Sequence, residues 1–152
     1  MLTRLEDYHT QLEAMMAEGD AVMAARDPAS VGLVKSRITE TVLLITSYQL
    51  YVHREIFAPL LVSGSPERRV RANELKVECI ALTEDLRFNV REFMGKEGPL
   101  DWSLTAARVA WFNGRVREHI GHVRQLMTPG LSPADIARFR AHRTDSIGAQ
   151  AA

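Results

Sequence analysis

The sequence has almost no cysteine and no excess of either charge. Its 152 residues include one cysteine, Cys79, so no disulfide can form within the chain. The 19 lysines and arginines balance the 19 aspartates and glutamates, and the basic residues form no dense run. A balanced charge provides no electrostatic reason to bind nucleic acid or an anionic membrane, and we expect neither as a partner.

Long apolar segments are also missing. The longest covers residues 41–45, whereas a transmembrane helix needs about 20 apolar residues. The start of the chain carries charges at Arg4, Glu6, Asp7 and Glu13, so it lacks the apolar centre of a signal peptide. We therefore expect a cytoplasmic protein.

The sequence does contain clear signals for where helices begin and end. Three dipeptides place a capping side chain directly before a proline, the preferred order at a helix start: Asp27-Pro28, Ser65-Pro66 and Ser132-Pro133. Thr3 and Glu6 have the spacing of a capping box. Glycine and proline near 95–99 and 128–130 are expected to end two helices. We predict helices over 4–26, 29–62, 66–94, 101–127 and 133–142, with a loose tail from Arg143.

Apolar residues recur three and four positions apart in the four long segments, which is typical of helices with one buried face. In the first segment this stripe contains Leu5, His9, Leu12, Met16 and Met23. Short connections place such helices antiparallel around one core. The sequence therefore predicts an all-α fold, an up-and-down antiparallel four-helix bundle over 3–129. A short helix and flexible tail over 130–152 would follow it.

Each predicted stripe carries an atypical residue near the same end of the bundle. These residues are His9 in the first helix, Tyr51 and Glu55 in the second, Cys79 in the third, and His119 in the fourth, with His122 nearby. Imidazole, carboxylate, phenol and thiol groups that face one another inside a bundle are the layout of a metal site built from facing helices. We take these six residues as candidate metal ligands.

The candidate residues lie in four short motifs: DYHTQL at 7–12, YVHREIFAPLL at 51–61, CIAL at 79–82 and HIGHVRQLMTP at 119–129. In this order they resemble the four helix motifs of hemerythrin-like (HHE cation-binding) domains. Those motifs are a histidine followed by xxL, HxxxE followed by an apolar pair and Pro-Leu, HxxL, and HIxxEExLxP. The resemblance implies two iron ions held by histidines and bridged by two carboxylates. It also implies a role in oxygen binding or in iron, nitric oxide or redox handling.

Half of the positions depart from the family pattern. The positions that match its ligands are His9, Glu55 and His119. The positions that differ are Tyr51 and Cys79, which stand where the family has histidine, and Val123, which stands where it has the second glutamate. Val123 has no donor atom, so one bridge is lost. Tyr51 and Cys79 bind a metal only when they are deprotonated.

Neighbouring residues offer partial replacements. His53 lies two positions from Glu55, roughly on the opposite side of the helix, and we expect it to face solvent. Glu78 could turn into the core beside Cys79, and His122 could supply one nitrogen. One iron or zinc ion bound by His9, Glu55 and His119, with Tyr51 or Cys79 as the fourth ligand, is chemically feasible.

Two classes of function stay open at this point. One is a hemerythrin-like protein with an altered metal site that serves redox chemistry or the sensing of oxygen or nitric oxide. The other is a metal-free interaction or signalling module that binds a protein partner or a second copy of itself. A histidine phosphotransfer bundle is disfavoured, because neither His53 nor His119 is followed by xxKG. No nucleophile–base pair, phosphate loop or dinucleotide motif is present, so we do not expect an enzyme.

Overall fold

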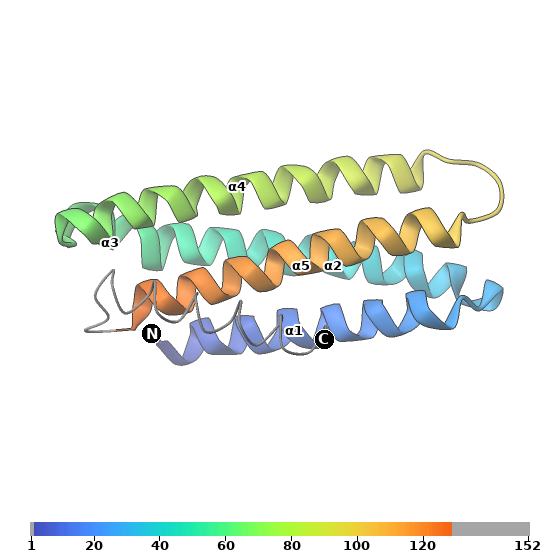
Figure 1. Cartoon of the computed structure of the whole chain (residues 1–152), viewed down its shortest axis with the longest axis horizontal. Helices are drawn as coiled ribbons and strands as arrows, with labels where there is room; N and C mark the ends of the chain where they lie inside the picture. The colour runs from blue at the N-terminus through green and yellow to red at the C-terminus, as the bar shows by residue number, and fades with distance from the viewer. Residues whose placement is uncertain (1, 129–152) are drawn as a thin grey trace, which may run out of the picture.

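The computed structural model of the chain describes residues 2–128. The predicted helix over 133–142 and the tail after it lie outside the described residues. Four long helices run side by side along the long axis of the molecule (Figure 1): α1 (Leu2–Ala25), α2 (Val31–Tyr51), α4 (Pro66–Met94) and α5 (Trp102–Met127). Each packs mainly against two of the others, α1 and α4 each against α2 and α5. The all-α prediction is therefore confirmed for residues 2–128, which contain no strand.

Capping side chains mark three helix starts, and two of these caps, Asp27 and Ser65, were predicted. The side-chain oxygens of three residues accept a hydrogen bond from a backbone N–H two or three residues further on: Asp27, Ser65 and Asp101. Thr3 was predicted to cap the first helix, but that is wrong, because α1 already begins at Leu2. Gly98 has φ +102°, a conformation that favours glycine, in the loop between α4 and α5.

The second predicted helix spans the expected residues, but its hydrogen-bonding pattern changes along its length. A short 3₁₀ turn, η1 (Pro28–Ser30), precedes α2, and a π-helical segment, η2 (Val52–Phe57), joins α2 to α3 (Ala58–Ser63). Pro59 explains why the helix widens here. Proline has no N–H to donate, and its ring would collide with the Glu55 carbonyl in a regular α-helix. The wider turn changes the direction of the side chains within it.

Burial of the predicted stripes provides the core. Fully buried side chains come from α1, η2, α4 and α5: Leu12, Val52, Leu75 and Val123. Burying a side chain of this size stabilises a fold by roughly 1.5 to 3 kcal/mol. No helix among the described residues combines the length and apolar character needed to cross a membrane.

Polar contacts hold α1 and α5 in register. Near one end, Arg124 donates hydrogen bonds to Glu13 at 3.0 Å and to Glu6 at 3.1 Å. Further along, Asp20 accepts hydrogen bonds from Asn113 and Arg117, each at 2.8 Å. Exposed ion pairs of this kind add little stability, but here they align the two helices that carry His9 and His119.

Candidate functional site

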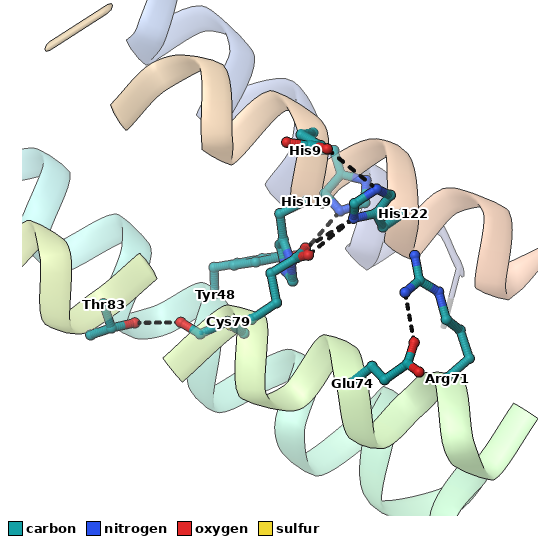
Figure 2. A network of polar contacts seen from close by, with 10 residues as sticks. His9, Tyr48, Arg71, Glu74, Cys79, Thr83, His119 and His122 are labelled. Carbon is teal, nitrogen blue, oxygen red and sulfur yellow. Dashed lines mark hydrogen bonds and ion pairs between the residues drawn. The ribbon is translucent and has the colours of Figure 1, made fainter. Parts of the chain in front are cut away.

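A polar cluster lies inside the bundle between α4 and α5 (Figure 2). The buried Nδ1 of His119 lies 2.7 Å from Oε1 of Glu78, and Nδ1 of His122 lies 3.1 Å from both oxygens of the same carboxylate. Burial acts to raise the pKa of Glu78, but its hydrogen bonds to the two histidines outweigh burial and hold the pKa well below its usual range. Glu78 is therefore ionised at neutral pH and bridges the two histidines.

This carboxylate orients the imidazole of His119. An ionised carboxylate can only accept hydrogen bonds, so Nδ1 of His119 carries a proton. In the neutral ring, Nε2 then presents a lone pair to the interior of the bundle. That nitrogen is buried and has no hydrogen-bond partner.

Tyr48 on α2 lies between the two most buried histidines. Nε2 of His9 is 3.4 Å from the Tyr48 hydroxyl, and the Tyr48 ring meets His119 edge-on with ring centres 5.8 Å apart. Burial lowers the pKa of His9 to about 4, so this ring is neutral at pH 7. Burial raises the pKa of Tyr48 well above its usual value, so it stays a neutral phenol. We call His9, Tyr48, Glu78, His119 and His122 the histidine cluster.

The interior carries several polar atoms that are left without partners. Among the described residues, four buried side-chain nitrogens lack a hydrogen bond, and three of them belong to His9 (Nδ1), His53 (Nε2) and His119 (Nε2). The carboxylate of Glu6 lies 3.7 Å from Nδ1 of His9, too far for a good hydrogen bond. A buried polar atom without a partner costs about 1 to 3 kcal/mol. Such atoms need an explanation, such as an ordered water or a bound ion.

His53 contradicts the prediction that it faces solvent. It is half-buried, its ring centre lies 5.5 Å from that of Phe57, and burial lowers its pKa. The prediction assumed a regular α-helix, whereas His53 lies in the π-helical segment η2, where the wider turn brings this side chain inward.

Two predicted ligands contact residues outside the histidine cluster. The Glu55 side chain is 38% exposed, and its carboxylate lies 3.4 Å from Nε of Arg54 rather than beside a histidine. Tyr51 is buried, but its ring stacks on Tyr8 with centres 5.1 Å apart, and the Arg4 guanidinium covers it at 5.2 Å. The structure thus brings together His9, His119 and His122, with Glu78 in place of Glu55 and Tyr48 in place of Tyr51.

Sequence reasoning missed Tyr48 and underrated Glu78. Tyr48 follows the apolar spacing of its helix, three positions after Ile45 and four before Val52. Its hydroxyl is the signal that it can also serve the site. Glu78 stands beside Cys79 at the edge of a stripe, from where a long carboxylate side chain can reach a neighbouring helix.

Cys79 is buried next to the cluster but is chemically inert. Burial, together with the negative charge of Glu78, raises the pKa of its thiol to about 12. The thiolate is the form that binds metals and attacks electrophiles, so this side chain behaves as a small apolar residue at neutral pH.

The donor set does not fit a di-iron centre. Val123 is fully buried and has no donor atom, and the carboxylate of Glu55 is partly exposed and contacts Arg54 rather than a histidine, so neither bridging carboxylate is in place. Within residues 2–128, no three histidine, cysteine, aspartate or glutamate side chains are grouped so as to hold a metal ion. His119 nevertheless has the surroundings of a metal-binding histidine, since a carboxylate engages one ring nitrogen and the other is buried without a partner.

Comparisons with known proteins assign no family. No family model matches the chain, and neither a curated protein nor a solved structure matches it.

Proposed function

We propose that the chain is a hemerythrin-like protein, with helices in up-and-down antiparallel order, that binds one iron or zinc ion in place of the family's iron pair. The observation that carries the proposal is the buried Nε2 of His119. It has no partner, while Glu78 engages Nδ1 of the same ring at 2.7 Å. Histidines that bind metals commonly donate their second N–H to a carboxylate in this way.

Two further nitrogens support a histidine-rich site. Nδ1 of His9 and Nε2 of His53 are buried without partners, and a metal ion would satisfy such lone pairs. His9 is neutral at pH 7, because its pKa is about 4, so it need not lose a proton before binding. The three side chains are not grouped around one point, so binding would include a change of rotamer. A bound iron ion would supply redox chemistry and affinity for oxygen or nitric oxide.

Metal binding can be measured directly. The purified full chain would be stripped with a chelator, loaded anaerobically with Zn²⁺ or Fe²⁺, desalted and analysed for metal content. We expect one ion per chain, loss of binding in His119→Asn, and binding 10- to 100-fold weaker in Glu78→Gln, which removes the orienting charge.

His122→Asn is the matched control. His122 also contacts Glu78, but none of its ring nitrogens is both buried and without a partner. This variant should keep the metal. A wild-type chain that retains no stoichiometric iron or zinc would reject the proposal, as would retention by His119→Asn equal to that of the wild type.

A second candidate function is a metal-free interaction module that binds a protein partner or a second copy of the chain. It is favoured by exposed apolar side chains at seven-residue spacing on two neighbouring helices. Leu43 and Leu50 on α2 are 65% and 68% exposed, and Val70 and Val77 on α4 are 62% and 58% exposed. Seven residues are about two helical turns, so each pair lies on one face of its helix. Clustered apolar exposure is typical of protein interfaces.

Sedimentation velocity over a wide concentration range tests self-association. A dimer that dissociates when Leu43 and Leu50 are both changed to glutamate would support the module. A monomer at every concentration would exclude a second copy as the partner.

A further inference from the structure

The buried stripe of α1 has a gap at Gly19. Its buried members follow alternating spacings of four and three residues: Leu5, His9, Leu12, Met16 and Met23. The same spacing places residue 19 between the last two members, and this residue is glycine. A Cβ atom built at Gly19 meets nothing within 4 Å. The core therefore lacks one side chain at this level of the bundle.

A pocket of about 120 Å³, partly open to solvent and called the cavity at Gly19 below, lies beside this gap. All four long helices contribute to its lining, which includes Met15, Met23, Val34, Leu86, Val90 and Phe112. It shares no residue with the histidine cluster. An engineered apolar cavity of about 150 Å³ in another protein stays dry and binds benzene. The cavity at Gly19 therefore has the size and lining to hold a small apolar molecule.

Arg108 adds a charge to this apolar site. It is partly exposed, lines the cavity, and makes no hydrogen bond or ion pair with any residue in the described range. Arg37, the other arginine of the lining, is already paired with Glu18 and Glu40, each at 3.0 Å. The two arginines differ in this respect, so Arg108 is the one available to bind a ligand.

Arg108 also lines a second pocket of about 190 Å³, which the loop between α4 and α5 helps to form. Its lining contains both signs of charge: Lys35, Lys96, Glu92, Glu97 and Asp101. The three acids outnumber the two lysines by one, but none of them forms a hydrogen bond or ion pair with Arg108. The guanidinium of Arg108 is therefore the unpaired group next to the apolar cavity that can recognise an anion. Arginine binds a carboxylate through two parallel hydrogen bonds.

We propose that the cavity at Gly19 binds a small carboxylic acid, with its apolar part against the methionine and phenylalanine side chains and its carboxylate on Arg108. The ligand would be a short fatty acid or an aromatic acid of about the size of benzene. The proposal is independent of metal binding, because the two sites share no residue.

The NMR signals of methionine methyl groups can detect binding, because Met15 and Met23 line the cavity. The full chain would be labelled with ¹³C-methyl methionine and titrated with hexanoate and with 1-hexanol, which have the same chain length and differ in charge. We expect saturable shifts of the Met15 and Met23 signals, while Met94, outside the cavity lining, stays unchanged. Hexanoate should bind about tenfold more tightly than hexanol, as expected for a hydrogen bond between charged groups.

Variants separate the two parts of the site. Arg108→Gln should remove the preference for hexanoate and leave hexanol binding unchanged. Gly19→Leu should fill the cavity and weaken binding of both probes at least tenfold. Gly114→Leu is the matched control, because a Cβ there also meets nothing within 4 Å and Gly114 does not line the cavity. Circular dichroism would check that each variant is folded.

Saturable shifts at Met15 and Met23, with a preference for hexanoate that Arg108→Gln abolishes, would support the proposal. The absence of saturable shifts with either probe would overturn it, as would equal affinity for the two probes in the wild type. Unchanged binding in folded Gly19→Leu would overturn it as well, since the probes would then bind elsewhere.

Discussion

The buried imidazole of His9 should make the stability of this protein fall in mildly acidic solution. Its pKa is lowered from 6.5 to about 4, chiefly because burial disfavours the charged ring. Between these two values the unfolded chain binds a proton that the folded chain excludes, so the free energy of unfolding decreases as pH falls. Each pH unit in this range corresponds to about 1.4 kcal/mol. From pH 6.5 to 5 the loss from His9 is therefore about 1.6 kcal/mol, because the unfolded ring is already half protonated at pH 6.5.

Urea unfolding at pH 8, 7, 6 and 5, with a chelator present throughout, measures this loss. His9→Gln is the comparison, since glutamine keeps a polar group beside Tyr48 but does not titrate. The wild type should lose about 1.6 kcal/mol more than the variant between pH 6.5 and 5, and the stabilities of the two proteins should change in parallel above pH 7. His53 contributes in the same direction in both proteins, because burial lowers its pKa too. Equal slopes between pH 6.5 and 5 would refute the assignment to His9.

Three other predictions concern single side chains. Glu78→Gln should destabilise the chain by about 1 to 3 kcal/mol at pH 7 in urea unfolding. Because the pKa of Glu78 is lowered, its contribution to the free energy of unfolding is present above pH 4.5 and is lost as pH falls through the folded-state pKa. The variant should lack this acid-sensitive contribution. Equal stability of the variant and the wild type at pH 7 would contradict the bridge. Gly19→Leu should raise the free energy of unfolding by about 1 to 3 kcal/mol, because leucine has the higher helix propensity and fills the cavity. Thermal unfolding tests this prediction against Gly114→Leu, which gains helix propensity only. Equal stabilisation of the two variants would contradict the filling of the cavity. With a thiol pKa of about 12, Cys79 should react with a disulfide reagent at pH 8 only as fast as the chain unfolds, and rapid labelling of the native protein would be evidence against its burial.

The helices were predictable because their signals are local. A capping oxygen at Asp27 or Ser65 acts on a backbone N–H two or three residues away, so its effect can be seen in the sequence. The apolar stripes are equally local, since side chains three and four positions apart always share one face of a helix. The buried positions of His9, Cys79 and His119 followed directly from their places in these stripes.

The polar partners within the core were not predictable in this way, because they depend on contacts across helices. Glu78 meets His119 from 41 positions away, and Tyr48 meets His9 from 39 positions away. Such pairs depend on how far each helix is rotated about its axis. One π-helical turn before Pro59 was enough to bring His53 inward, contrary to the prediction for a regular helix.

The amino-acid sequence thus specified the helices and the faces that they bury, since hydrogen bonds and side-chain contacts over three or four residues determine both. The carboxylate that joins the histidine cluster, Glu78 rather than Glu55, followed only from the packed bundle. The same is true of the cavity beside Gly19, because an absent side chain leaves a space only when four helices close around it.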